Sequence, residues 1–370
     1  MPPFDATADW IADRATLQAW LDAVPAGAVV GMDTEFMRRD SFHPQLALLQ
    51  LGCRGRHALV DPLAFAIDDA LRPRLGDGDA VTVMHSAGED LETLAPMLPD
   101  GPRVLFDTQI AAAFVGMGLG LSYRALVAEL CGDELDKGET RSDWMQRPLT
   151  ASQRSYATLD VVYLESIHSQ LGERLQQRDR SAWFAEDCER LKRRASQHEG
   201  DPQPQRTLRG AAEWPTERQA LLRRILLWRD RSARTLDRPR PWLLDDALAM
   251  SLAQQPPASL AELEQRGRGQ RALRGAQRSE LFALLRAPVD HDEIAATRPI
   301  PAHPQGEAKK ALGEMKVLVD ERAAELDLPP GLLCPRKVLE EYVVTAEWPD
   351  FLDGWRGEVL HERLPGLLPG

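Results

Sequence analysis

The sequence is poor in cysteine and lacks cysteine motifs. Its four cysteines, Cys53, Cys131, Cys188 and Cys334, are scattered with no CxxC spacing. Small disulfide-stapled domains and zinc–thiolate sites both require cysteines at short, regular spacings. We therefore expect four free thiols and neither a disulfide framework nor a zinc site.

Long apolar runs are absent as well. No window of 18 consecutive apolar residues occurs, and the N-terminal "MPPFDATADW" has neither the basic start nor the apolar core of a signal peptide. The sequence therefore predicts a cytoplasmic protein that does not contact the membrane.

Positive charge is scarce, which would ordinarily count against a nucleic-acid partner. The formal net charge is −12 and the chain has only six lysines, whereas binding to phosphates depends on cationic side chains. The average conceals a basic segment, because residues 201–290 carry 16 arginines against 11 acidic residues. A GC-rich genome would explain arginine in place of lysine, but it would not explain this local excess of positive charge.

Two polar, proline-containing stretches divide the chain. Residues 195–210 and 287–307 have no sustained apolar period, which is typical of linkers between domains. The sequence therefore predicts three domains, over residues 1–205, 210–290 and 300–370.

The first domain alternates short apolar runs with helical patterns. Strands are predicted over residues 28–36, 45–52, 56–60, 80–85 and 103–107, and helices over 63–75, 89–98, 108–115 and 150–175. Three strands precede the first helix, which indicates an antiparallel meander, and the later strands are separated by helices, which indicates parallel additions. The expected fold is a mixed α/β sheet followed by two all-α domains.

Acidic residues stand at three places where this domain would expose them. Asp33 and Glu35 are two apart on a predicted strand, so they share one face, and Asp90 falls in the first turn of a predicted helix. Tyr156 and Asp160 are four apart on a predicted helix and are therefore neighbours. Each feature alone has an ordinary explanation, as a solvated strand end, a helix cap or a common helix face.

Taken in order, the three features resemble the DEDD exonuclease superfamily in its tyrosine variant. The blocks "DTEF", "PQLALLQL", "HSAGEDLETL", "LDKGETRSDWMQRPLT" and "YATLDVVYL" are similar to the bacterial ribonuclease D family and span most of residues 28–165. The resemblance implies a ribonuclease-H-like exonuclease domain. It also implies hydrolysis of phosphodiesters with two divalent metal ions, Mg²⁺ or Mn²⁺, and no nucleotide cofactor.

The resemblance also implies roles for the five residues. Asp33 would bridge the two ions, Glu35 and Asp160 would complete the first, and Asp90 would hold the second, partly through water. Tyr156 would orient the attacking water, since a phenol with a pKa near 10 is a poor base at neutral pH. Without a cation, we expect part of this carboxylate cluster to be protonated or disordered.

Five side chains near the motifs are further candidates for substrate contact: Thr34, Phe36, His85, Lys137 and Arg141. Phe36 could wedge against the terminal base or belong to the core. His85 could touch substrate or make a local hydrogen bond. Lys137 or Arg141 could approach the substrate backbone or form an ordinary ion-paired surface.

The two helical domains resemble a known nucleic-acid-binding module. "RPRPWLLDDALAMSLA" and "PASLAEL" in residues 210–290 are similar to the HRDC domain, and residues 300–370 look like a second, diverged and acidic copy. The basic segment would then attract RNA that an acidic metal site repels. The alternative is a merely solvated basic helix face.

The resemblance implies a monomeric 3′→5′ exoribonuclease that trims transfer RNA precursors and other small structured RNAs and releases nucleoside 5′-monophosphates. Two alternatives remain open on the residues themselves. The protein could be a DNA 3′→5′ exonuclease, because the same site serves both substrates, or a non-catalytic RNA-binding protein on a nuclease fold.

Overall fold

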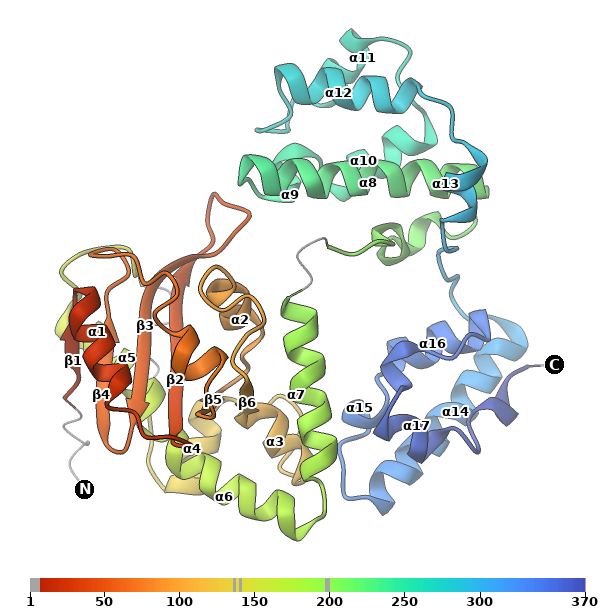
Figure 1. Ribbon diagram of the computed structural model, residues 1–370. Helices are drawn as coiled ribbons and strands as arrows, with labels where there is room; N and C mark the ends of the chain where they lie inside the picture. Colours follow the sequence, from red (N-terminus) through yellow and green to blue (C-terminus); the bar gives the residue numbers. More distant parts are fainter. Residues whose placement is uncertain (1–6, 136–137, 140–141, 197–199, 370) are drawn as a thin grey trace.

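The computed structural model describes residues 7–135, 138–139, 142–196 and 200–369, and it arranges them as a sheet-containing nuclease body and two helical units. In Figure 1 the nuclease body lies beside both units, and α7 runs along the side that faces them. The expected α/β domain followed by all-α regions is confirmed. The three predicted domain boundaries remain predictions.

The sheet has six strands in the order β1-β4-β3-β2-β5-β6. The strands are β1 (Asp9–Ile11), β2 (Val29–Met37), β3 (Gln45–Cys53), β4 (Arg56–Val60), β5 (Val81–Met84) and β6 (Val104–Asp107). As predicted, β2, β3 and β4 form an antiparallel meander, and β5 and β6 add in parallel. Strand β1, which pairs in parallel with β4, was not predicted, because three residues are too short to show a period of two.

Seven α-helices surround this sheet. They are α1 (Arg14–Asp22), α2 (Gly88–Leu94), α3 (Thr108–Phe114), α4 (Tyr123–Cys131), α5 (Ala151–Val162), α6 (Leu164–Gln177) and α7 (Ser181–Ala195). The predicted helix over 63–75 is wrong: only a five-residue π-helix, Arg72–Gly76, forms there. Asp68 has a positive φ of 48° and Pro73 lacks a backbone donor, and both interrupt a regular helix.

The first helical unit, residues 216–295, builds its own apolar core. It consists of α8 (Thr216–Leu236), α9 (Arg240–Leu243), α10 (Asp246–Gln254), α11 (Leu260–Arg266), α12 (Gly275–Arg286) and α13 (His291–Ala295). Its core cluster, which includes Trp228 and Ile225, contains one residue from the nuclease body, Phe42.

Phe42 belongs to the β2–β3 hairpin tip, residues 38–44. The guanidinium groups of Arg234 and Arg240 lie 4.7 and 4.6 Å from the centroid of its ring. Asp237 Oδ1 accepts hydrogen bonds from the backbone N–H groups of Phe42 and His43, at 2.9 and 3.0 Å. The hairpin tip thus connects the nuclease body to the end of α8.

The second helical unit, residues 306–367, shares its core with the nuclease body. It contains α14 (Gly306–Glu325), α15 (Pro330–Leu333), α16 (Arg336–Thr345) and α17 (Trp355–Leu360), with short 3₁₀ helices at Asp350–Leu352 and Pro365–Leu367. Buried side chains of this unit and of the sheet belong to one continuous apolar cluster.

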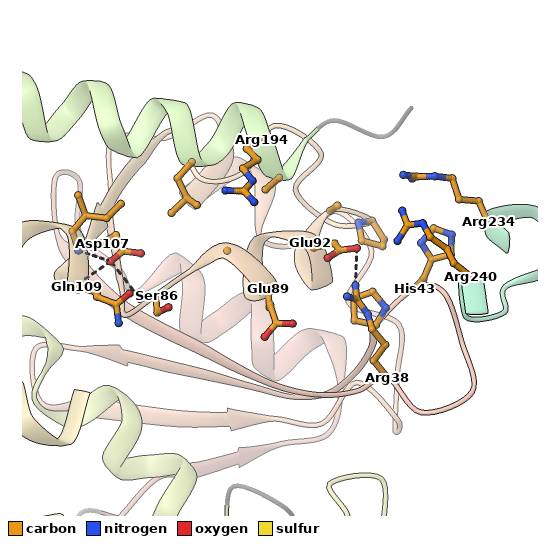
Figure 2. Close-up of a pocket in the computed structure, with 17 residues that line it drawn as sticks. Arg38, His43, Ser86, Glu89, Glu92, Asp107, Gln109, Arg194, Arg234 and Arg240 are labelled. Carbon is orange, nitrogen blue, oxygen red and sulfur yellow. Dashed lines mark hydrogen bonds and ion pairs between the residues drawn. The ribbon is translucent and has the colours of Figure 1, made fainter. Parts of the chain in front are cut away.

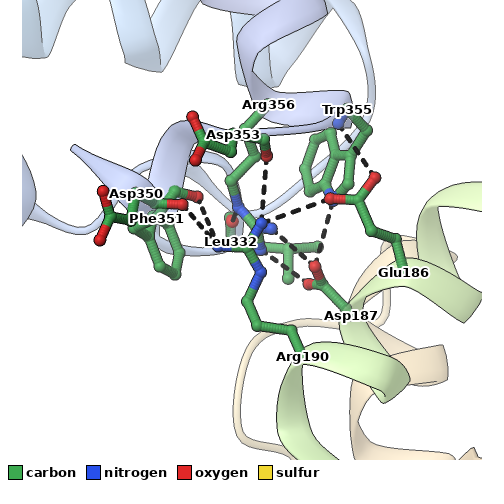
Figure 3. A network of polar contacts seen from close by, with 9 residues as sticks. All are labelled: Glu186, Asp187, Arg190, Leu332, Asp350, Phe351, Asp353, Trp355 and Arg356. Carbon is green, nitrogen blue, oxygen red and sulfur yellow. Dashed lines mark hydrogen bonds and ion pairs between the residues drawn. The ribbon is translucent and has the colours of Figure 1, made fainter. Parts of the chain in front are cut away.

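A buried ion pair lies at the centre of that junction (Figure 3). Both oxygens of Asp187 on α7 accept hydrogen bonds from the Arg356 guanidinium, at 2.6 and 2.7 Å. The Trp355 indole N–H donates to the same carboxylate, and its ring stacks on Trp183 with the centroids 4.8 Å apart. Arg190 donates to three backbone carbonyls of residues 350–353. The second helical unit is therefore fixed to α7.

The four cysteines are free thiols, as predicted, and three of them, Cys53, Cys188 and Cys334, are buried. Of the helices that the structure describes, none is both long and apolar enough to span a bilayer.

Candidate active site

Strand β2 carries the first two carboxylates of the site. Asp33 pairs across the sheet with Gln50 and Glu35 with Leu48, so both acidic side chains lie on one face of the sheet. The pairing register then shifts between Glu35 and Phe36. Such a bulge bends a strand and redirects its side chains, so the acidic pair stands where β2 leaves the regular ladder.

Two glycines allow a helix to lie close to these carboxylates. A Cβ on Gly31 would lie 3.2 Å from the carbonyl oxygen of Val161, and a Cβ on Gly52 would lie 3.3 Å from the same atom. Side chains at either position would push α5 and α6 away from the sheet. This close approach brings Asp160, one residue before Val161, next to β2.

Helix α5 presents Tyr156 and Asp160 on one side, as predicted. Its N-terminus is fixed by a capping box, in which Thr150 and Gln153 bond each other's backbone N–H groups. The Tyr156 ring lies 6.0 Å from buried Trp144, centroid to centroid. Gly138 approaches so closely that a Cβ there would lie 2.0 Å from Tyr156 Cδ2. The phenol is therefore held between a buried indole and a backbone segment that only glycine fits.

Asp90 enters from α2, whose first turn favours a carboxylate. It is buried and accepts a hydrogen bond from the Thr34 hydroxyl. Asp107 organises the turn that precedes this helix, since its carboxylate accepts the N–H groups of Ala87, at 2.8 Å, and Ser86, at 3.3 Å. Asp107 was not predicted as a site residue, although "FDT" at a strand end followed by a helix is an N-cap signal.

Burial raises the pKa values of all four carboxylates, and repulsion within the cluster raises those of Asp33, Glu35 and Asp160 further. Burial, followed by repulsion from Asp90, Asp160 and Glu35, raises the pKa of Asp33 well above its usual range. Burial and the same kind of repulsion raise the pKa of Glu35 to about 9 and that of Asp160 to about 7. Burial raises the pKa of Asp90 to about 6, against the hydrogen bond from Thr34. Over the described residues, no positively charged side chain offsets these four pKa shifts.

Two tyrosines border the cluster. Burial, then the negative charges of Asp160, Glu35 and Asp33, raises the pKa of Tyr156 above its usual value, so the phenol stays protonated at neutral pH. Tyr123 was not predicted as a site residue. Burial and Asp160 raise its pKa too, and its hydroxyl donates to the Leu159 carbonyl oxygen at 3.0 Å. No spacing motif links Tyr123 to the acidic residues, so sequence alone gave no signal for it.

The donor set fits divalent metal ions. All four groups are carboxylates, the ligands that Mg²⁺ and Mn²⁺ prefer. The amide of Gln50, which pairs across the sheet with Asp33, is fully buried, and neither of its polar atoms has a hydrogen-bond partner, as expected for a group beside a hydrated ion. Over residues 7–135, 138–139, 142–196 and 200–369, no three acidic, histidine or cysteine side chains are arranged to hold an ion as they stand. Repulsion between like charges favours keeping the carboxylates apart when no cation lies between them.

The predicted substrate contacts lie in different surroundings. The Thr34 side chain is buried and bonded to Asp90, so a substrate contact of Thr34 would come from its backbone. His85 is half-buried, and its Nδ1 lies 2.8 Å from the Thr108 hydroxyl, which is the local hydrogen bond considered above. Lys137 and Arg141 lie outside the described residues.

Phe36 faces one of two cavities beside the cluster. The Glu35 cavity has a volume of about 430 Å³ and is lined by Glu35, Phe36, Met37, Arg39, Ser142, Asp143, Trp144 and Met145. The Tyr156 cavity, of about 800 Å³, is lined by residues that include Tyr123, Leu135, Ser155, Tyr156 and Asp160. A nucleic-acid end placed at the carboxylates would have space on both sides.

Comparisons with known proteins agree with this geometry. Residues 8–176 match the family described as 3′-5′ exonuclease, and residues 218–284 match the HRDC domain. The chain is 42% identical to ribonuclease D of Xanthomonas oryzae pv. oryzae over 97% of this chain and 98% of that protein. It is 30% identical to ribonuclease D of Escherichia coli K12, over 95% and 96% of the two chains.

A solved structure shares the whole architecture. The crystal structure described as Escherichia coli RNase D, an exoribonuclease involved in structured RNA processing, superimposes with a TM-score of 0.81 at 28% identity, over 98% of both chains. The nuclease body and both helical units thus occur together in that relative.

Proposed function

This chain belongs to the ribonuclease D family of 3′-5′ exoribonucleases, and from that premise we propose how its site acts and on what. The observation that carries the proposal is the convergence of Asp33, Glu35, Asp90 and Asp160 into one electrostatically coupled cluster beside Tyr156. These are the residues that the sequence motifs single out.

Each residue has a role in hydrolysis. Asp33, Glu35 and Asp160 would hold one divalent ion, Mg²⁺ or Mn²⁺, and Asp33 and Asp90 a second. When bound, such ions stabilise charge on the attacking and leaving oxygens of a phosphodiester. Tyr156 donates its hydroxyl proton in a hydrogen bond that orients the attacking water, because its raised pKa makes it unsuitable as a base.

The substrates that this arrangement suits are the 3′ ends of transfer RNA precursors and other small structured RNAs, shortened one nucleoside 5′-monophosphate at a time. Two observations support an RNA partner. A relative is described as acting in structured RNA processing, and residues 201–290 carry the local excess of arginine. A monomeric, cytoplasmic enzyme remains a prediction.

The second helical unit is proposed as a diverged HRDC-like domain. Its 20-residue α14 is followed by the four-residue α15, which begins with proline, and then by α16. The first unit has the same succession in α8, α9 and α10. Both short helices have proline in their first turn, and the repeated order of a long helix, such a short helix and a further helix supports a shared origin.

Activity on defined substrates tests the proposal. We expect the full-length protein with Mg²⁺ or Mn²⁺ to shorten a 3′-extended transfer RNA from its 3′ end and to be inactive in EDTA. Asp33→Ala and Asp160→Ala should abolish hydrolysis while circular dichroism stays unchanged, and Tyr156→Phe should leave measurable activity. Near-normal turnover in either aspartate variant would refute the metal assignment. Faster shortening of single-stranded DNA than of RNA would favour the DNA exonuclease alternative.

A further inference from the structure

The Glu35 cavity shares one lining residue with a cavity that reaches the first helical unit. Arg39, an exposed residue of the hairpin tip, lines this cavity and also a second one of about 650 Å³. The second cavity, the Trp242 cavity, lies between the hairpin tip and α9 and is lined by residues that include Phe42, Arg229, Arg240 and Trp242. One arginine therefore joins the candidate active site to the first helical unit.

The far side of the Trp242 cavity is bordered by an arginine-rich turn. The Arg271 guanidinium lies 5.0 Å from the centroid of the Trp242 indole, and the Ala272 N–H donates to the Trp242 carbonyl oxygen at 2.7 Å. The turn that contains Arg271, residues 267–274 and here named the arginine loop, also exposes Arg268 and Arg274. Three cationic side chains and an aromatic ring thus follow Arg39 along one surface.

Two acidic residues line the Trp242 cavity. Asp246 is paired with Arg229 at 2.6 Å. Asp245 accepts hydrogen bonds from the Leu248 N–H at 2.8 Å and the Gln270 amide at 2.7 Å, two neutral donors that hold it in place. Arg39 and the three arginines of the arginine loop are exposed beside them.

A larger cleft on the other side of the hairpin tip is a weaker candidate (Figure 2). It has a volume of about 830 Å³ and places Arg38, Arg194, Arg234 and Arg240 near three carboxylates, those of Glu89, Glu92 and Asp107. Arg38 is paired with Glu92 at 2.6 Å. A polyanion would meet nearly balanced charge there, and His43 is the one aromatic side chain among the described residues that line the cleft.

We propose that Arg39, Trp242 and the arginine loop form a binding track for single-stranded RNA, which holds the segment on the 5′ side of the nucleotide being removed. The proposal rests on the proposed function, since it takes the carboxylate cluster as the place of cleavage. Arginines bind phosphates through charge-assisted hydrogen bonds, and an aromatic ring accepts a base by stacking. Both contacts tolerate any sequence, as repeated trimming requires.

The test compares matched triple variants of the full-length protein. R268A/R271A/R274A removes three exposed arginines of the arginine loop, and K309A/K310A/K316A removes three exposed lysines of α14 in the second helical unit. Binding of a fluorescent single-stranded RNA of about 20 nucleotides, longer than typical single-strand site sizes, is measured by anisotropy in EDTA. Hydrolysis of this RNA and of a dinucleotide is measured with Mn²⁺.

We expect the arginine variant to weaken RNA binding about tenfold or more at low salt and the lysine variant to bind like the wild type. The negative slope of log K against log salt should become shallower by about 2, since each phosphate contact on a single strand contributes about −0.7. The ratio of kcat/KM for the long RNA to that for the dinucleotide should fall about tenfold in the arginine variant alone.

Equal RNA affinity of the arginine variant and the wild type, or equal losses in both triple variants, would overturn the track. If the wild type binds RNA and the arginine variant does not, but no RNA is shortened with metal present, the track stands and the proposed function fails. The two failures are therefore distinguishable.

Discussion

The second helical unit shares its apolar core with the nuclease body, whereas the first helical unit has a core of its own and meets that body at the hairpin tip. The junction between the second helical unit and the nuclease body contains a buried ion pair between Asp187 and Arg356. The junction of the first helical unit includes the Phe42 ring and hydrogen bonds to the side chain of Asp237. There the Arg238 guanidinium also donates to the Asp40 carbonyl oxygen. The second unit is thus attached through a shared apolar core, and the first through the hairpin tip.

The two helical units also differ in net charge. Residues 291–370 carry 9 basic against 15 acidic residues, while residues 201–290 are basic. The unit that is fused to the nuclease body is acidic and suits a structural role. The first helical unit, which meets the nuclease body at the hairpin tip, is the one that we propose binds RNA.

The largest effect is expected at the fused junction. Asp187→Ala leaves the buried Arg356 guanidinium without its counter-ion and removes the acceptor of the Trp355 indole. Breaking a buried pair in this way costs about 3–5 kcal/mol. We expect the free energy of unfolding of the nuclease body and second helical unit to fall by that amount together, as measured by denaturant titration.

The control is an exposed ion pair. Arg298→Ala removes the partner of Glu347, where both side chains are about half exposed, and should change the unfolding free energy by less than about 1 kcal/mol. Replacing both partners, as Asp187→Leu with Arg356→Met, should recover part of the loss. Separate unfolding of the second helical unit in the wild type would show that the two do not share one core.

The junctions also show how far the sequence could predict this molecule. Asp33, Glu35, Asp90, Tyr156 and Asp160 could be proposed as one site because their motifs, taken in order, resemble those of the DEDD exonuclease superfamily. Asp187 and Arg356 are 169 residues apart, and Phe42 and Asp237 are 195 apart. Such contacts leave no periodic signal, since they depend on how finished units pack against one another.

The same reasoning explains the wrong and missed elements. The apolar pattern over residues 63–75 favoured a helix, but the backbone at Asp68 has a positive φ, which a regular helix does not allow. The apolar pattern does not report this backbone conformation. Tyr123 joins the site only because α4 packs beside α5, as its hydrogen bond to Leu159 indicates. Local propensity predicted the elements that carry the motifs better than those that complete the site.

Divalent metal should stabilise the nuclease body and leave the first helical unit unaffected. A ligand at 100 times its Kd adds about 2.7 kcal/mol to the folded state that binds it. We expect calorimetry with and without Mn²⁺ to show that only the transition of the nuclease body and second unit moves upward. A shift of equal size in the first unit would contradict the separation of the two cores.

The pH dependence of the metal-free protein has a defined sign. The folded pKa values of Glu35 and Asp160, about 9 and about 7, lie above those of unfolded carboxyls, so the folded state binds more protons. Stability from this source is present at pH about 4 and is lost as the pH rises toward about 9. The midpoint of unfolding, measured in EDTA, should therefore decrease as the pH is raised from 6 to 9. Glu35→Gln, which mimics the protonated side chain, should reduce this slope.

The smallest effect on unfolding is expected at the hairpin tip. Phe42→Ala removes the ring that Arg234 and Arg240 cover, and burial of one phenylalanine side chain contributes about 1.5–3 kcal/mol. This energy stabilises docking of the first helical unit, so the nuclease body should keep its unfolding free energy within about 0.5 kcal/mol, an ordinary surface effect. Hydrogen exchange should accelerate in residues 38–44 and at the end of α8.

Leu260→Ala, at an exposed position of α11, is the control and should leave exchange at the hairpin tip unchanged. If Phe42→Ala destabilised the nuclease body as much as Asp187→Ala does, the two junctions would be equivalent, and the first helical unit would be as firmly fixed as the second.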